Sequence, residues 1–123
     1  MINYDAFVFG DGPSVIAYAG KVPSGLKTKK ELLESVGQAL SFPEYYGVNW
    51  DAFEECIRDL SWLPEGVIVL VHEDLPMEED DASRRTYLDI LSGAVGKWKG
   101  DTKRSLCICF PSNVEGRLRA IGN

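Results

Sequence analysis

Apolar residues are spaced along this chain in two ways, one typical of amphipathic helices and the other typical of buried strands. Helical spacing predicts helices over residues 29–41, 50–61 and 82–98, and a short terminal helix over 113–121. Thr28 and Glu31 have the spacing of a capping box before the first helix, and Asn49 is a candidate N-cap for the second. Helix starts are therefore marked locally in the sequence.

Four apolar runs predict strands. Residues 67–71 and 106–110 are continuously apolar, as expected of parallel strands buried on both faces. Two shorter runs, residues 5–9 and 15–19, flank a Gly-Asp-Gly-Pro-Ser segment and predict a hairpin, or a strand followed by a long turn. The order of elements predicts an α/β fold: a short, parallel, three-stranded sheet packed against helices, with an extra N-terminal strand or hairpin and a short C-terminal helix.

Composition bounds the class of protein. The chain has 123 residues, of which 45% are hydrophobic and 26% charged, so we expect one globular domain rather than a disordered chain. It has no apolar run of membrane-spanning length and no N-terminal signal pattern, which predicts a cytoplasmic protein without membrane attachment. The three cysteines, an odd number without zinc-ligand spacing, suit a reducing compartment; they are Cys56, Cys107 and Cys109.

The negative charge is concentrated in the middle of the chain. The formal net charge is −6, but residues 44–81 contain 12 acidic residues and one basic residue, hence −11, while the rest carries +5. An acidic protein of this kind is not expected to bind nucleic acid directly. A basic protein partner is the better expectation.

Residues suited to catalysis or metal binding are scarce. The single histidine, His72, ends a strand, and the Gly10–Gly12 segment lacks the third glycine of a dinucleotide-binding loop. The cysteines fall on apolar faces, with both thiols of the 106–110 strand on one face, where core packing explains them. The acidic run 78–81 lacks the ligand pattern of a calcium loop. We therefore expect no enzymatic activity, no cofactor and no metal site.

Segment 42–60 carries the most informative pattern. On the polar face of its helix, Asp51, Glu55 and Asp59 recur every fourth residue, with Glu54 beside them and only Arg58 to offset their charge. Like charges at this spacing destabilise a helix by roughly 0.2–0.5 kcal/mol per pair. Since the row lowers the stability of the helix, we interpret it as functional rather than as an ordinary solvated surface.

Two tyrosines, Tyr45 and Tyr46, precede Gly47 on the loop before this helix, and Trp50 begins the helix. Aromatic side chains beside concentrated carboxylates are typical of an interface for a cationic protein, in which the rings are buried and the carboxylates bind Arg and Lys. The alternative is a solvated acidic helix with both tyrosines packed in the core.

The segment 42–56 resembles the barstar family, the intracellular inhibitors of secreted bacterial ribonucleases. The family pattern PEYYG-x-N-x-DA is present as Pro43–Ala52, and weaker similarity extends over residues 26–110. The resemblance implies a short parallel sheet packed against helices. It also implies that the loop with Tyr45 and Tyr46 (the tyrosine loop) and the following helix block a ribonuclease active site. In that complex the carboxylates take the place of RNA phosphates. Residues 1–20 and 111–123 are then extensions of a single domain, residues 1–123.

Within the resemblance, Tyr45 corresponds to an interface tyrosine, Asn49 caps the helix at the interface edge, and Asp51 corresponds to a contact aspartate. At the position of Glu55 the family has its most important interface residue, an aspartate, whose side chain is one methylene shorter than that of glutamate. The predicted partner-binding residues are Tyr45, Tyr46, Asn49, Trp50, Asp51, Glu54, Glu55, Arg58 and Asp59.

Besides Glu55, four positions depart from the family pattern. Glu54 replaces an interface tryptophan, and Arg58 and Asp59 stand at positions that are small or neutral elsewhere in the family. The contact glutamate of the later helix falls near Gly93 and is absent. With these departures, the cognate enzyme need not be the family's usual ribonuclease.

Two functions follow from these observations. The first is an intracellular inhibitor, or immunity protein, that blocks the active site of a cognate toxic and basic nuclease, which we expect to be a ribonuclease. The alternative is a barstar-like interaction or regulatory module without a nuclease partner. A metal-dependent acidic enzyme is disfavoured by the missing ligand spacing. The sequence leaves the oligomeric state open and favours a monomer.

Overall fold

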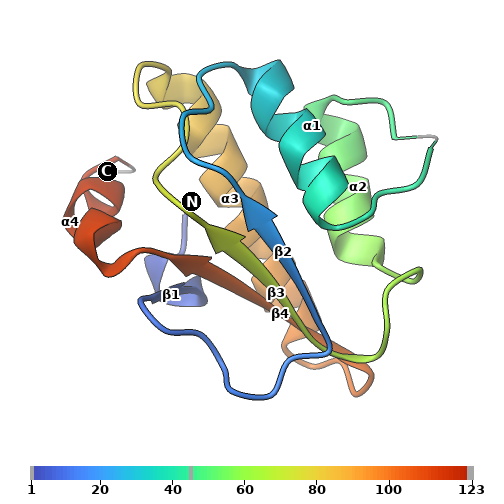
Figure 1. Ribbon diagram of the computed structural model, residues 1–123. Coiled ribbons are helices and arrows are strands. Elements are labelled where there is room, and N and C mark those ends of the chain that lie inside the picture. The colour runs from blue at the N-terminus through green and yellow to red at the C-terminus, as the bar shows by residue number, and fades with distance from the viewer. Residues whose placement is uncertain (1, 45, 122–123) are drawn as a thin grey trace.

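The computed structural model describes residues 2–44 and 46–121, which form a four-stranded parallel sheet and four α-helices (Figure 1). In chain order the elements are η1 (Tyr4–Ala6), β1 (Phe7–Phe9), β2 (Tyr18–Val22), α1 (Lys29–Ala39), α2 (Trp50–Asp59), β3 (Gly66–His72), α3 (Asp81–Trp98), β4 (Arg104–Phe110), η2 (Ser112–Val114) and α4 (Glu115–Arg119). The strands lie in the order β1-β4-β3-β2, and every neighbouring pair is parallel. The predicted α/β class is confirmed, and the fourth strand is the predicted extra strand at the N-terminus.

The helices begin at the predicted caps. Before α1, the Thr28 hydroxyl accepts a hydrogen bond from the backbone N–H of Glu31 (3.1 Å), and the Glu31 carboxylate accepts one from the Thr28 N–H (3.1 Å). The helix ends are less predictable: α1 stops at Ala39 and α2 at Asp59, each two residues early. In α2 the next residue, Leu60, takes a left-handed conformation (φ 52°), which ends the helix.

The N-terminal strand alternative is confirmed, and the hairpin alternative is wrong. β1 pairs with β4 at one edge of the sheet, whereas β2 pairs with β3 at the other. Their connection, residues 10–17, passes from one edge of the sheet to the other (Figure 1). Val15 and Ile16 lie in this connection and are exposed (79% and 44%), so β2 starts at Tyr18, three residues later than predicted.

The two faces of the sheet are buried differently. On one face, alternate residues of β3 and β4 pack under the helices, and their side chains are at most 6% exposed: Ile68, Leu70, Leu106, Ile108 and Phe110. On the other face Val69 and Cys109 are buried as well, but Val67, Val71 and Cys107 are only partly buried. The prediction that both faces of the central strands are buried therefore holds only in part, because α1, α2 and α3 pack on one side only (Figure 1).

Contacts between α2 and α3 position the helix that carries the acidic residues. The Trp98 indole N–H of α3 donates a hydrogen bond to the Ile57 carbonyl of α2 (3.0 Å). The rings of Phe53 and Tyr87 stack with their centroids 5.6 Å apart, and both side chains are fully buried. Among the described residues, no helix is both long and apolar enough to cross a membrane.

His72, at the end of β3, is a buried part of the core. Its Nδ1 lies 3.0 Å from the Cys109 carbonyl oxygen and its Nε2 lies 2.6 Å from the Tyr87 hydroxyl, while its ring stacks on Phe110. A carbonyl oxygen only accepts, so Nδ1 carries the proton and Nε2 accepts the Tyr87 O–H. Burial lowers the pKa of His72 from 6.5 to about 4, which keeps the imidazole neutral in the folded chain.

This histidine predicts a loss of stability in mild acid. As the pH falls below 6.5, the unfolded chain binds a proton at His72 that the folded chain does not bind until about pH 4. The free energy of unfolding should therefore fall by about 3 kcal/mol between these pH values through this residue. Urea titrations at several pH values measure the effect. His72→Phe should lower stability at neutral pH and flatten this dependence, and parallel profiles for both proteins would contradict the assignment.

Candidate functional site

The helix α2 has one buried side and one exposed side. Phe53, Cys56 and Ile57 are at most 4% exposed and face the core. On the opposite side Asp51, Glu54, Glu55 and Asp59 are exposed; these four residues form the acidic face. The sequence pattern predicted both sides, because the 3.6-residue period determines which residues share a side of a helix.

The carboxylates of the acidic face are mostly unneutralised. Within the part of the chain that the structure describes, the ion pair on this face joins Arg58 Nε to Glu54 Oε2 at 3.7 Å. Both side chains are more than 40% exposed, so this pair contributes little to stability. Asp51, Glu55 and Asp59 follow one another at four-residue intervals, with no salt bridge to a described Lys or Arg. The helix thus presents a row of negative charge to solvent.

The N-terminus of α2 is joined to the preceding loop through Asn49. Its side-chain oxygen accepts a hydrogen bond from the Ala52 N–H (2.8 Å), and its side-chain amide donates one to the Gly47 carbonyl (3.3 Å). Val48, between them, takes a positive φ of 50°. Asn49 therefore holds the last turn of the loop against the first turn of the helix.

Replacing Asn49 by alanine should destabilise the folded chain by about 1 kcal/mol, because the Ala52 N–H loses its partner and the loop loses its link to the helix. Asn49→Asp, which retains a good capping oxygen, should restore most of this loss. Urea denaturation of the two variants beside the wild type measures the difference. Equal losses in both variants would show that the cap contributes nothing.

Tyr46 packs against α1. Its ring meets Phe42 edge to face (4.9 Å between centroids), and its hydroxyl donates a hydrogen bond to the Leu33 carbonyl (3.1 Å). Gly37 makes this approach feasible, because a Cβ there would lie 2.9 Å from the Tyr46 ring. Burial raises the pKa of Tyr46 well above its usual value. Tyr46 thus positions the loop, and contact between its remaining exposed part and a partner stays a prediction. Tyr45 lies outside the described residues.

Trp50 and Arg58 lie at opposite ends of α2. Trp50 is half-buried, with its ring edge to face on Phe53. The Arg58 guanidinium lies over Gly93 of α3, where an added Cβ would come within 3.2 Å of Arg58 Nη2. The position that carries a contact glutamate in the resemblance is thus occupied here by an arginine from α2.

Lys97 of α3 completes this end of the site and was not predicted. Its ammonium donates a hydrogen bond to the Arg58 carbonyl (2.8 Å) and lies 3.7 Å from the centre of the Trp98 ring. A cation at the C-terminus of a helix stabilises the helix dipole. No spacing in the sequence distinguishes Lys97 from other solvent-facing lysines, because its partner is 39 residues away.

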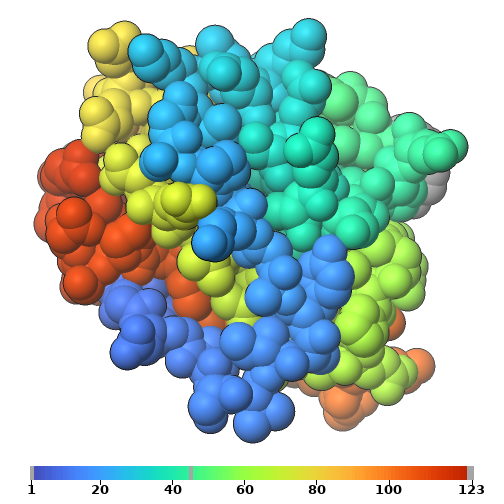
Figure 2. Space-filling view, viewed as in Figure 1, coloured from blue at the N-terminus to red at the C-terminus, as the bar shows by residue number. Residues whose placement is uncertain are grey.

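The surface beside the tyrosine loop is hollowed. A shallow groove of about 360 Å³ lies between α1 and the loop, lined by Glu34, Gly37, Gln38, Ser41, Phe42, Pro43, Glu44, Tyr46 and Val48. The described residues of this loop lie at the right of the molecule in Figure 2. The groove thus shares Tyr46 and Val48 with the loop that precedes α2.

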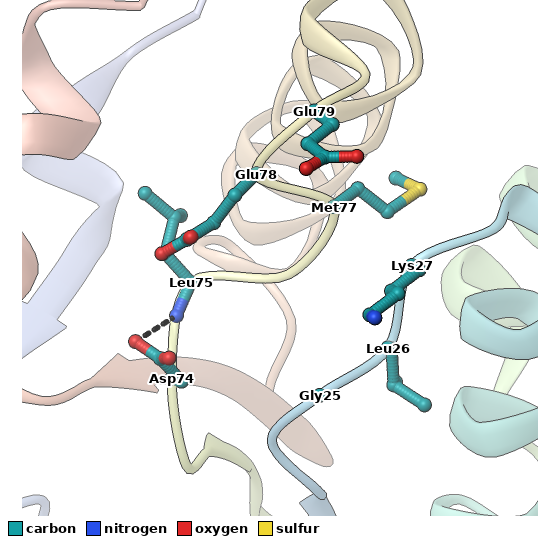
Figure 3. Close-up of a pocket in the computed structure, with 8 residues that line it drawn as sticks. All are labelled: Gly25, Leu26, Lys27, Asp74, Leu75, Met77, Glu78 and Glu79. Atoms are coloured by element: carbon teal, nitrogen blue, oxygen red, sulfur yellow. Dashed lines mark hydrogen bonds between the residues drawn. The ribbon is translucent and has the colours of Figure 1, made fainter.

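A second hollow lies at the carboxyl ends of β2 and β3, between residues 25–27 and 74–79 (Figure 3). It has a volume of about 150 Å³, and two of its three carboxylates pair with Arg117: Asp74 (3.5 Å) and Glu78 (2.7 Å). Asp80, next along the chain, caps α3 by accepting the Ser83 N–H. Among the described residues no group of three His, Cys, Asp or Glu side chains could hold a metal ion.

The fold and the acidic face together define a small α/β protein that displays an acidic helix. The family model described as "Barstar (barnase inhibitor)" matches residues 23–110, well over half of the chain, and the chain therefore belongs to the barstar family. This is a family of inhibitors rather than of enzymes. Among curated proteins none matches the sequence. The match includes Pro43–Ala52 and the whole acidic face, while β1, β2 and α4 lie outside it.

Proposed function

We propose that this protein is an intracellular immunity protein that binds a cognate toxic nuclease, a ribonuclease, and blocks its active site with the acidic face and the tyrosine loop. The observation that carries the proposal is the row of Asp51, Glu55 and Asp59, exposed and without salt bridges to the described lysines and arginines. A nuclease active site presents Arg, Lys and His side chains to phosphates, and carboxylates at helical spacing offer the same charge.

The rigidity of α2 and of the adjoining loop also supports the acidic face as the binding surface. The buried side of α2 is held by α3 through Trp98 and Lys97, so the acidic face sits on a rigid element. The Asn49 cap and the packed Tyr46 hold the adjoining loop in place. A preorganised face loses little conformational entropy on binding, which favours high affinity.

The charge of the acidic face predicts the rate at which the two proteins associate and its dependence on salt. Opposite fields on the two proteins should speed association and make it sensitive to salt, because charges that are exposed before contact are screened within roughly 10 Å at 0.1 M salt. Arg58, the one cation on this side of α2, requires a carboxylate or a polar group on the partner. This requirement and the glutamates at positions 54 and 55 are expected to determine which nuclease is bound.

The experiment that tests the proposal uses two nucleases: barnase, and a nuclease toxin encoded beside the gene for this chain. RNA hydrolysis by each enzyme is measured while the purified chain is added, and binding is measured at low and high salt. Stoichiometric inhibition of either enzyme, weakened by salt, supports the proposal. The proposal is wrong if the chain inhibits neither enzyme and if the neighbouring toxin still kills cells that also express the chain.

The second candidate is a barstar-like interaction module without a nuclease partner. It is favoured by the replacement of an interface tryptophan by Glu54 and of the contact glutamate by Gly93. Under this alternative, proteins captured from the native host by the wild-type chain are not nucleases. Capture by a variant with neutral residues at positions 51 and 55 is then unchanged.

A further inference from the structure

Cys107 and Cys109 form a pair of thiols that the proposed function does not use. They are alternate residues of β4 and share the face of the sheet opposite α3, because successive side chains of a strand point to opposite faces. Their sulfur atoms lie 3.7 Å apart. Cys107 is partly exposed and Cys109 is buried, so solvent reaches the pair from the Cys107 side.

The separation of the sulfur atoms fits one bridging atom better than a disulfide. Two metal–sulfur bonds of about 2.3 Å at a tetrahedral angle place their sulfurs about 3.8 Å apart, close to the observed distance. A disulfide needs about 2.05 Å, so the sulfurs would have to approach by about 1.6 Å within a central strand paired on both sides.

The surroundings of the pair select a soft ligand. Cys107 lies opposite Val69 and Cys109 opposite Val71 in the register of the sheet. The backbone of Gly12 lies over Cys109, and a Cβ there would come within 3.0 Å of its sulfur. No third His, Cys, Asp or Glu among the described residues joins the two thiols, so a hard ion such as Mg²⁺ would find no oxygen ligands.

We propose that Cys107 and Cys109 chelate one thiophilic divalent ion of the Zn²⁺ and Cd²⁺ class. Each thiol releases its proton to solvent as its metal–sulfur bond forms, and the remaining coordination positions are open to water or small ligands. With two protein ligands instead of the four of a structural zinc site, the ion exchanges readily. The site lies on the face of the sheet away from α2, so it is independent of the acidic face.

Cadmium is a suitable probe because thiolate-to-metal charge transfer absorbs in the ultraviolet, whereas binding to carboxylates does not produce this band. The full-length chain is titrated with Cd²⁺ in excess Mg²⁺, which occupies the surface carboxylates. We expect one Cd²⁺ per chain, with at least tenfold weaker binding in Cys107→Ser and in Cys109→Ser. Cys56→Ser is the matched control, since it also leaves two cysteines, and should bind as the wild type does.

A protection experiment covers the case in which Cys109→Ser fails to fold. The wild-type chain is alkylated with and without Cd²⁺, and modification of each cysteine is measured by mass spectrometry. Slower alkylation of Cys107 in the presence of Cd²⁺, with Cys56 unaffected, supports the site. A charge-transfer band that is absent from the wild type, or that persists in Cys107→Ser and disappears in Cys56→Ser, overturns it.

Discussion

Replacing Glu55 by alanine is expected to weaken binding to the cognate nuclease by about 30-fold to about 3,000-fold, which corresponds to about 2–5 kcal/mol. Glu55 is the middle carboxylate of the row on α2, exposed in the free chain and flanked one turn away by Asp51 and Asp59. On binding it would be the most deeply covered, and its removal would leave a cation of the enzyme buried without a partner. Asp51→Ala should have the next largest effect.

The matched control is Glu65→Ala, which removes one exposed carboxylate from the turn before β3 and changes the net charge equally. It should alter affinity by no more than the general change in charge. Glu55→Asp restores the side-chain length of the family and should retain binding. Calorimetry or inhibition titrations give the affinities. If Glu55→Ala and Glu65→Ala bind alike, the nuclease contacts a different face.

Phe53→Ala should destabilise the folded chain by about 3–5 kcal/mol, a large part of the 5–15 kcal/mol typical of a domain. The Phe53 ring is fully buried between α2 and α3, stacked on Tyr87 and in contact with Phe42 and Trp50. Removing it leaves a cavity at the junction that orients the acidic face. Nuclease binding should weaken as well, because the unfolded fraction does not bind.

Unfolding in urea, followed by tryptophan fluorescence, measures this loss. Glu54→Ala on the exposed side of the same helix should change stability by no more than about 0.5 kcal/mol. Phe53→Leu should lose less than Phe53→Ala because it fills part of the cavity. A Phe53→Ala midpoint within error of the wild type would mean that the α2–α3 junction does not depend on this ring.

The helices and the acidic face were predictable because the information for them is local. A helix repeats every 3.6 residues, so the residues that share a side of α2 follow from spacing alone. The Thr28–Glu31 box and the Asn49 cap lie within three residues of the groups they bind. The pattern Pro43–Ala52 predicted the family for the same reason, since it is a continuous segment.

The pairing of β1 and β2 was not predictable in this way. Apolar residues on both sides of a Gly- and Pro-containing segment suit a hairpin, but both strands find parallel partners elsewhere: β1 beside β4, and β2 beside β3. Which strands pair depends on the whole sheet, because each strand must bury its apolar side under the same helices. Val15 and Ile16, apolar and yet exposed, show that composition alone does not identify a strand.

By itself, the sequence determined the positions of the helices, their buried and exposed sides, and the concentration of carboxylates on α2, because each depends on residues within one or two turns. Only the tertiary structure decided the rest. Tyr46 packs on α1, Lys97 binds the end of α2, His72 is buried against Tyr87, and the thiols of β4 lie on the face that the helices leave open. Those contacts join distant segments, or depend on which face of the sheet the helices cover, and no local pattern encodes either.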